Sequence, residues 1–105
     1  MSYFVVTREA GPAWIDGKNT FEQPAVTEHA AYMNALADEG VVLFAGPLAG
    51  SEHGRIRVLL VIVSDDEAEV RRRLADDPWA RTERLVTSRV EHWNLLVGAE
   101  RLSTV

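Results

Sequence analysis

One run of this chain changes directly from a helical pattern to a strand pattern, and it limits the folds that the chain can adopt. Residues 26–48 read VTEHAAYMNALADEGVVLFAGPL. Up to Gly40, apolar residues recur at steps of three and four, which predicts an amphipathic helix packed against a flat surface. Residues 41–45 then form a short apolar run of strand type, which Gly46-Pro47 ends because proline cannot donate to a sheet. This pattern predicts a helix that lies on a β-sheet.

Two further segments have the composition of buried strands. Residues 3–8 read YFVVTR, and residues 56–63, IRVLLVIV, form the most apolar run in the chain. Their β-branched content and short length favour strands over helices, and the second strand is expected in the middle of the sheet. Between them, residues 9–24 carry Gly, Pro, Asp and Asn, which predict a long surface loop.

A second helix and a last strand complete the pattern. Ser64 and Glu67 match a capping box, in which two side chains bond backbone N–H groups at the start of a helix. This helix is expected to end at Asp77-Pro78, since the residue before a proline avoids the helical conformation. Residues 85–96 alternate in polarity and predict a strand with one wetter face.

The predicted order of elements is strand, helix, strand, strand, helix, strand. This order is typical of ferredoxin-like α+β folds, in which a four-stranded antiparallel sheet carries both helices on one face. With 105 residues the chain can build one such core, so residues 1–105 are expected to form a single domain. The other face of the sheet would expose apolar side chains, which predicts a homodimer.

Composition narrows the class of partner to a small molecule. The net charge of −5 argues against nucleic acid, because the field of the chain would repel phosphates. The chain contains no cysteine, which excludes disulfides and thiolate zinc sites and fits a cytoplasmic protein. No apolar run approaches the ~20 residues that span a bilayer, so no membrane partner is expected. The motifs G-x-G-x-x-G, P-loop and H-E-x-x-H are absent, and no cofactor or metal is expected.

The predicted topology brings polar residues together at one end of the sheet. The first helix starts where the first strand ends, and the second helix ends near the same point. His29, near the start of the first helix, and Asp77, at the end of the second, are therefore expected within hydrogen-bonding reach. Gly46-Pro47 and the loop around His53 belong to that end too. The candidate substrate-binding residues are Trp14, Gly46, Pro47, His53 and Trp79.

His29 and Asp77 are the candidate catalytic residues. An aspartate that accepts from one imidazole nitrogen leaves the other free to take or give a proton, which suits elimination, isomerisation or hydrolysis of a small cyclic or carbonyl compound. A histidine at the border of an apolar helix face is also a common structural residue, so a noncatalytic ligand-binding or assembly module is the alternative. A haem protein or aromatic oxygenase would require a large cavity beside His29 or His92.

An ordered set of motifs extends over nearly the whole chain. It comprises H-x-x-Y-x-x-x-L-x-x-x-G at residues 29–40, A-G-P-L at 45–48, D-D-x-A at 65–68, Asp77-Pro78 and the late Trp93. In these motifs the chain resembles the YciI-like, or YCII-related, family.

The resemblance implies a fold and a site. Members of that family have a ferredoxin-like fold of the dimeric α/β-barrel type, with an active site centred on a His/Asp pair that would correspond to His29 and Asp77. One branch removes chloride from chlorinated hydroxyquinol-type rings. The loop at residues 9–24, with Trp14 and Phe21, is longer than in compact members, so the resemblance does not identify a substrate.

Overall fold

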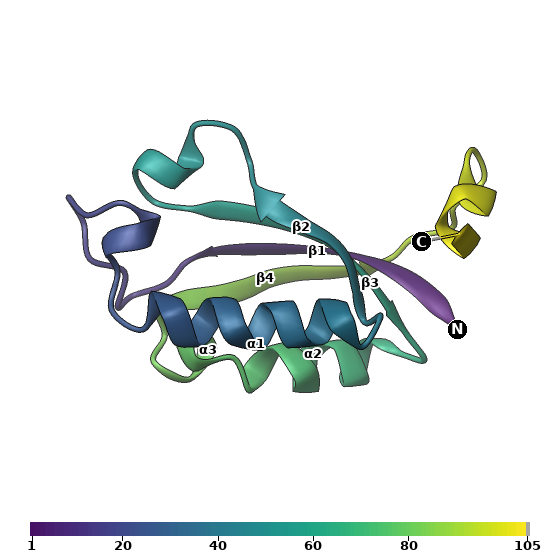
Figure 1. Ribbon diagram of the computed structural model, residues 1–105, viewed down its shortest axis with the longest axis horizontal. Helices are drawn as coiled ribbons and strands as arrows, with labels where there is room; N and C mark the ends of the chain where they lie inside the picture. The colour runs from purple at the N-terminus through teal and green to yellow at the C-terminus, as the bar shows by residue number, and fades with distance from the viewer. Residues whose placement is uncertain (105) are drawn as a thin grey trace.

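The computed structural model describes residues 1–104 and shows one four-stranded sheet with helices packed on it (Figure 1). The strand order is β2-β3-β1-β4, and all three neighbouring pairs are antiparallel. The ferredoxin-like α+β fold is therefore confirmed, with the most apolar strand in the interior of the sheet. The elements are β1 (Ser2–Ala10), the 3-10 turn η1 (Thr20–Glu22), α1 (Val26–Asp38), β2 (Val42–Pro47), η2 (Ser51–His53), β3 (Arg57–Ser64), α2 (Glu67–Ala75), α3 (Pro78–Arg81), β4 (Leu85–His92) and η3 (Ala99–Thr104).

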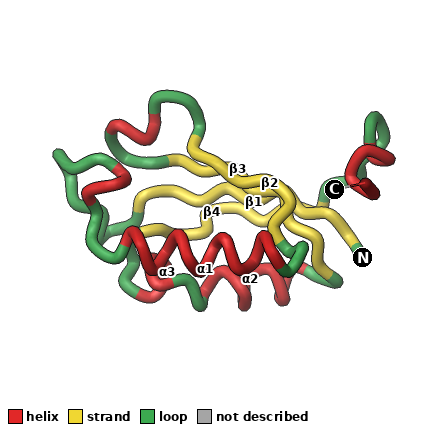
Figure 2. Tube along the Cα trace, in the orientation of Figure 1, coloured by secondary structure: helices red, strands yellow, loops and turns green. Residues whose placement is uncertain are grey.

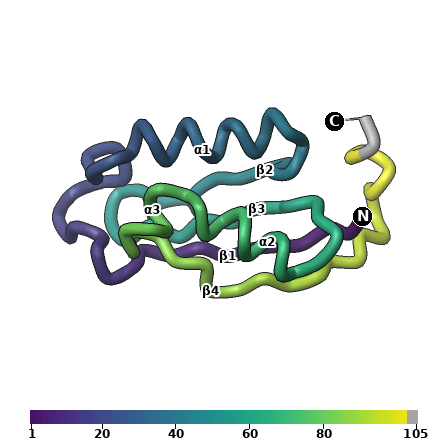
Figure 3. Tube along the Cα trace, turned by 90° about the horizontal axis from the view of Figure 1, so that it is seen from below, coloured from purple at the N-terminus to yellow at the C-terminus, as the bar shows by residue number. Residues whose placement is uncertain are grey.

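The helices α1 and α2 lie on the same face of the sheet, as the views from the side and from below show (Figures 2 and 3). The main core fills the space between this face and the helices. Its buried members are Phe4, Val6, Leu36, Val42, Leu60, Ile62, Val70, Leu74 and Val90. In β1 the alternate residues Phe4, Val6 and Arg8 point inward, because successive side chains of a strand leave opposite faces. Arg8 thus takes an inward position at the end where the site forms.

The opposite face of the sheet carries apolar side chains that no element of the described chain covers. Phe44 and Leu59, 53% and 42% exposed, belong to that face, since they alternate with inward residues of β2 and β3. Across residues 1–104, no helix combines the length and the apolar character that crossing a membrane would need.

The start of α2 differs from the prediction. Ser64 does not cap the helix, because its pairing with Ser2 keeps it in β3. Asp66 is the N-cap instead, and its side chain accepts from the N–H of Glu69. After α2 the Asp77-Pro78 step ends one helix and opens another, the short α3, with Asp77 as its N-cap.

Candidate active site

The carboxylate of Asp77 is fully buried and receives hydrogen bonds from three elements. Arg8 of β1 donates from Nη1 to Oδ2 over 2.8 Å. His29 of α1 contacts Oδ2 and Oδ1 through Nδ1, at 2.8 and 2.9 Å. The backbone N–H of Trp79 donates to Oδ1 over 3.0 Å. The predicted hydrogen bond between His29 and Asp77, 48 positions apart, is therefore present.

Charge in this cluster keeps Asp77 ionised. Burial by itself would raise the pKa of Asp77, but the hydrogen bond and charge of His29, and then the charge of Arg8, outweigh it and hold that pKa below its usual value. Because an ionised carboxylate only accepts hydrogen bonds, Nδ1 of His29 must carry a proton. In the neutral ring the other nitrogen, Nε2, is then a proton acceptor. No hydrogen bond from within residues 1–104 occupies it.

An aromatic pair holds the face of the imidazole. The rings of His29 and Trp79 are stacked, with centroids 4.0 Å apart and planes 6° apart. The indole is fixed in turn, because its Nε1 donates to the carbonyl oxygen of Pro24 over 2.8 Å. Trp14 packs edge-on against Trp79, with centroids 5.6 Å apart. The orientation of the His29 ring is thus set by Asp77 at its edge and by Trp79 at its face.

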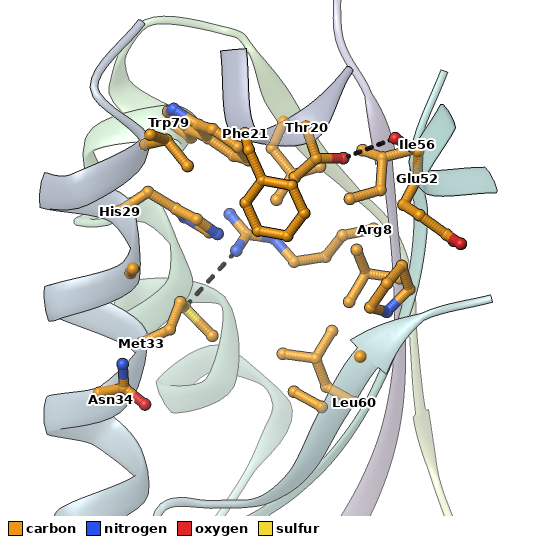
Figure 4. Close-up of a pocket in the computed structure, with 17 residues that line it drawn as sticks. Arg8, Thr20, Phe21, His29, Met33, Asn34, Glu52, Ile56, Leu60 and Trp79 are labelled. Atoms are coloured by element: carbon orange, nitrogen blue, oxygen red, sulfur yellow. Dashed lines mark hydrogen bonds between the residues drawn. The ribbon is translucent and has the colours of Figure 1, made fainter. Parts of the chain in front are cut away.

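A cavity of about 300 Å³ opens beside this cluster, between α1 and the inward face of β2 and β3 (Figure 4). Arg8 reaches across it from β1, and its guanidinium lies close to His29 and Met33 (Figure 4). Asn34, Thr20 and Glu52 also border it. The apolar or small wall residues are Phe21, Val26, Ala30, Ala45, Gly46, Pro47, Ile56, Val58, Leu60, Trp79 and Leu85.

The structure brings some of the predicted binding residues to this cavity and keeps others away. Gly46, Pro47 and Trp79 line it. Trp14 is 4% exposed and lies in the cluster with Trp79, not among the residues that line the cavity. The side chain of His53 is 80% exposed, contacts Glu52 and does not line the cavity.

Among the residues of this site that sequence reasoning missed are Arg8 and Phe21. The strand pattern marks Arg8 only as the last residue of a buried strand, although a charged residue at an inward position, after Phe4 and Val6, is a usable signal. Phe21 belongs to the 3-10 turn at the cavity mouth, which a turn-rich loop sequence does not locate. His92 packs on Phe4, with ring centroids 5.4 Å apart, and is not part of the site.

The described part of the chain offers no metal centre. Within residues 1–104, no three His, Cys, Asp or Glu side chains come together in a way that could hold a metal ion. The chemistry that the cluster itself supports is proton transfer at His29, beside a guanidinium that is held in place by Asp77.

The fold and the site define a class: small ferredoxin-like α+β proteins with an apolar pocket between helix and sheet and a histidine–aspartate pair at its end. The chain belongs to the YCII-related domain family, whose profile matches residues 2–94. A comparison with curated protein sequences gave no significant match.

Among solved structures, the chain is similar to 5-chloro-2-hydroxyhydroquinone dehydrochlorinase from Burkholderia phenoliruptrix, solved in complex with 2,5-dihydroxybenzoquinone. The match covers 93% of this chain and 97% of that chain, with a TM-score of 0.57 and 15% sequence identity. At this identity the likeness shows a shared fold.

Proposed function

We propose that this chain is a cofactor-independent enzyme that moves protons on a small cyclic or carbonyl compound, with His29 as the general acid and base and Asp77 as the residue that orients it. One observation carries this proposal. Nδ1 of His29 is engaged by a buried carboxylate, while the same ring borders an apolar cavity. General acid–base residues need this combination of a fixed tautomer and access to the ligand.

His29 acts as a base when its ring is neutral, and the protonated ring that results is the form whose charge, with its hydrogen bond, lowers the pKa of Asp77. Nε2 of His29 takes a proton from a C–H or O–H group of the ligand, and the electron pair of that bond stays on the ligand. Asp77 and the face of Trp79 then stabilise the imidazolium, through a charged hydrogen bond and a cation–π contact. Return of the proton to another ligand atom completes an isomerisation. Departure of a leaving group with its electron pair completes an elimination.

The size of the cavity and the structural neighbour support a ligand with a single ring. About 300 Å³ is the lower end of the range for small-molecule pockets. The neighbour is a dehydrochlorinase that was solved in complex with a benzoquinone. Compounds of these two kinds therefore belong in the first set of test ligands.

A noncatalytic binding module is the second candidate, because one observation also favours it. Asp77 is completely buried and receives bonds from Arg8, His29 and Trp79, which is how a structural ion pair is built. In that case the cavity binds a ligand that His29 does not alter. A haem protein or aromatic oxygenase is the third hypothesis, and it would need a large cavity. The cavity beside His29, at about 300 Å³, is smaller than this hypothesis requires.

Proton exchange in D₂O tests the catalytic assignment whatever the final product is. The protein is incubated with cyclic ketones, 2,5-dihydroxybenzoquinone and 5-chloro-2-hydroxyhydroquinone, and loss of C–H signals or release of chloride is followed. We expect wild type to accelerate one of these reactions and His29→Ala to slow it by about 10²–10⁴-fold. His92→Ala is the matched control, because it removes a histidine outside the cavity. Equal rates in wild type and His29→Ala, with ligand still bound, would favour the binding module.

A further inference from the structure

We infer that the free edge of the Arg8 guanidinium, formed by Nε and Nη2, is a subsite for an ionised oxygen group, so that the natural ligand is a small, planar, single-ring anion. The class includes carboxylates and ring oxygens ionised as phenolate or enolate. The binding of an anion to Arg8 does not depend on the proposed function above. Only the reaction of the bound ligand rests on that proposal.

Arg8 uses one part of its guanidinium for the protein and leaves another part unused. The residue is 1% exposed. Its Nη1 donates to Asp77 over 2.8 Å and lies 3.8 Å from the Met33 sulfur. Nε and Nη2 are buried, and no group within the described residues accepts a hydrogen bond from them.

Buried N–H groups of a charged side chain are costly to leave unpaired, and native proteins rarely do so without a functional reason. Nε–H and Nη2–H of an arginine are parallel and coplanar, and they match two oxygens of a carboxylate or two neighbouring ring oxygens. Asp77 already balances the charge of Arg8, so recognition depends on these two directed bonds more than on net charge.

The surroundings of Arg8 define the rest of the ligand. Arg8 lines the cavity together with His29, and Figure 4 shows its guanidinium close to that ring. The carboxylate that borders the cavity, Glu52, points away from Arg8 in the same view. The remaining walls are mostly apolar, as expected for the unsubstituted part of a ring. An oxygen group held on Arg8 would place the adjoining carbons beside His29.

Pairs of charged and neutral compounds of equal shape test this subsite in the intact protein. The pairs are benzoate with benzamide, and 4-nitrophenolate with 4-nitroaniline. We expect at least one anion to bind about tenfold or more tightly than its neutral counterpart, because only the anion satisfies both donors fully. The Nε–H resonance of Arg8 in a ¹⁵N NMR spectrum should shift as that anion binds.

Arg8→Lys separates the subsite from the ion pair. Lysine keeps a cation for Asp77 but has no second pair of directed donors, so the preference for the anion should disappear. Arg55→Lys is the matched control, because Arg55 is exposed and bonds Asp16 away from the cavity. This variant should keep the wild-type preference.

Each outcome of these experiments supports or overturns the anion subsite at Arg8. Preference within the benzoate pair identifies a carboxylate ligand, and preference within the nitrophenolate pair identifies an ionised ring oxygen. Equal binding within both pairs, or a preference that Arg8→Lys retains, overturns the subsite. If Arg8→Lys does not fold, an Arg8 Nε–H resonance that stays in place while the anion binds to wild type overturns it. These probes do not react and report on binding alone. Anion preference here, together with no proton exchange or chloride release for any compound of the D₂O assay, would contradict the catalytic proposal and leave the subsite intact.

Discussion

The imidazole of His29 and the indole of Trp79 are stacked, with centroids 4.0 Å apart and planes 6° apart. Trp79 lies two residues after Asp77, whose carboxylate bonds the edge of the same imidazole. The short helix α3 and its N-cap residue therefore supply the face partner and the edge partner of His29. This explains why an Asp-Pro step near the end of α2 matters to a residue on α1.

Replacing the two neighbouring tryptophans by phenylalanine should have unequal effects. Trp79→Phe removes the hydrogen bond from Nε1 to Pro24, whereas Nε1 of Trp14 is buried without a partner within residues 1–104. We expect Trp79→Phe to lower the free energy of unfolding by about 1 kcal/mol more than Trp14→Phe, since a satisfied buried hydrogen bond contributes roughly that amount. Urea denaturation of both variants measures the difference. Equal losses would show that the bond to Pro24 contributes nothing.

Asp77→Asn should be among the most destabilising single changes in this protein. The change leaves the buried guanidinium of Arg8 without a counter-charge, and breaking a buried ion pair in this way costs about 3–5 kcal/mol. For a domain of this size the melting temperature should fall by about 12 °C or more. A thermal melt followed by circular dichroism checks it. An unchanged melting temperature would mean that Arg8 and Asp77 are not paired in solution.

The stabilisation by Asp77 should vanish in acid. The folded-state pKa of Asp77 is depressed, once the effect of His29 and Arg8 has outweighed that of burial. The stability it contributes is therefore fully present above the unfolded-state pKa, about 3.9, and is lost as the pH falls through the lower folded-state value. The difference in unfolding free energy between wild type and Asp77→Asn should be constant near neutral pH and shrink below about pH 4. If this difference in unfolding free energy grows in acid, the pKa of Asp77 is raised in the folded state and not lowered.

His29→Ala should cost less stability than Asp77→Asn. After the change, Asp77 still accepts from Arg8 and from the N–H of Trp79, so no buried charge is left alone. We expect a loss of about 1 kcal/mol, from one hydrogen bond and the contact with Trp79. Parallel thermal melts rank the two variants. If His29→Ala is as unstable as Asp77→Asn, His29 contributes mainly to stability, and this result would favour the noncatalytic binding module.

The uncovered face of the sheet should pair with a second copy. Phe44 and Leu59 are exposed on that face, and a homodimer that buries at least ~1,200 Å² in total would cover them. We expect light scattering to give the dimer mass for wild type and the monomer mass for Leu59→Glu. Ala31→Glu, on the exposed side of α1, is the control and should remain a dimer. Monomeric wild type at micromolar concentration would contradict this.

The spacing of apolar residues was enough to predict the four strands and the two longer helices, though not α3 or the 3-10 turns, and their order was enough to predict the topology. The contact between His29 and Asp77 followed from the topology, because the order of elements places the start of α1 and the end of α2 at one end of the sheet. Hydrophobic periodicity is a local property, so it can be read from a segment without knowledge of the elements that pack against it.

The composition of the site was decided by packing between elements. Ser64 lost its predicted capping role because its pairing with Ser2 holds it in the sheet. Trp14 lies behind Trp79, and His53 turns to the surface, although both belong to segments near the site. Arg8 joins the site because its inward position on β1 meets a carboxylate from a helix 69 positions away.

The sequence by itself therefore determined the four strands and the two longer helices, their order, and which end of the sheet gathers the polar residues. Only the tertiary structure decided which side chains face the cavity and which donors stay unpaired there. The physical reason is that the direction of a side chain depends on strand register and on contacts with elements distant in sequence, and neither is encoded in the local pattern.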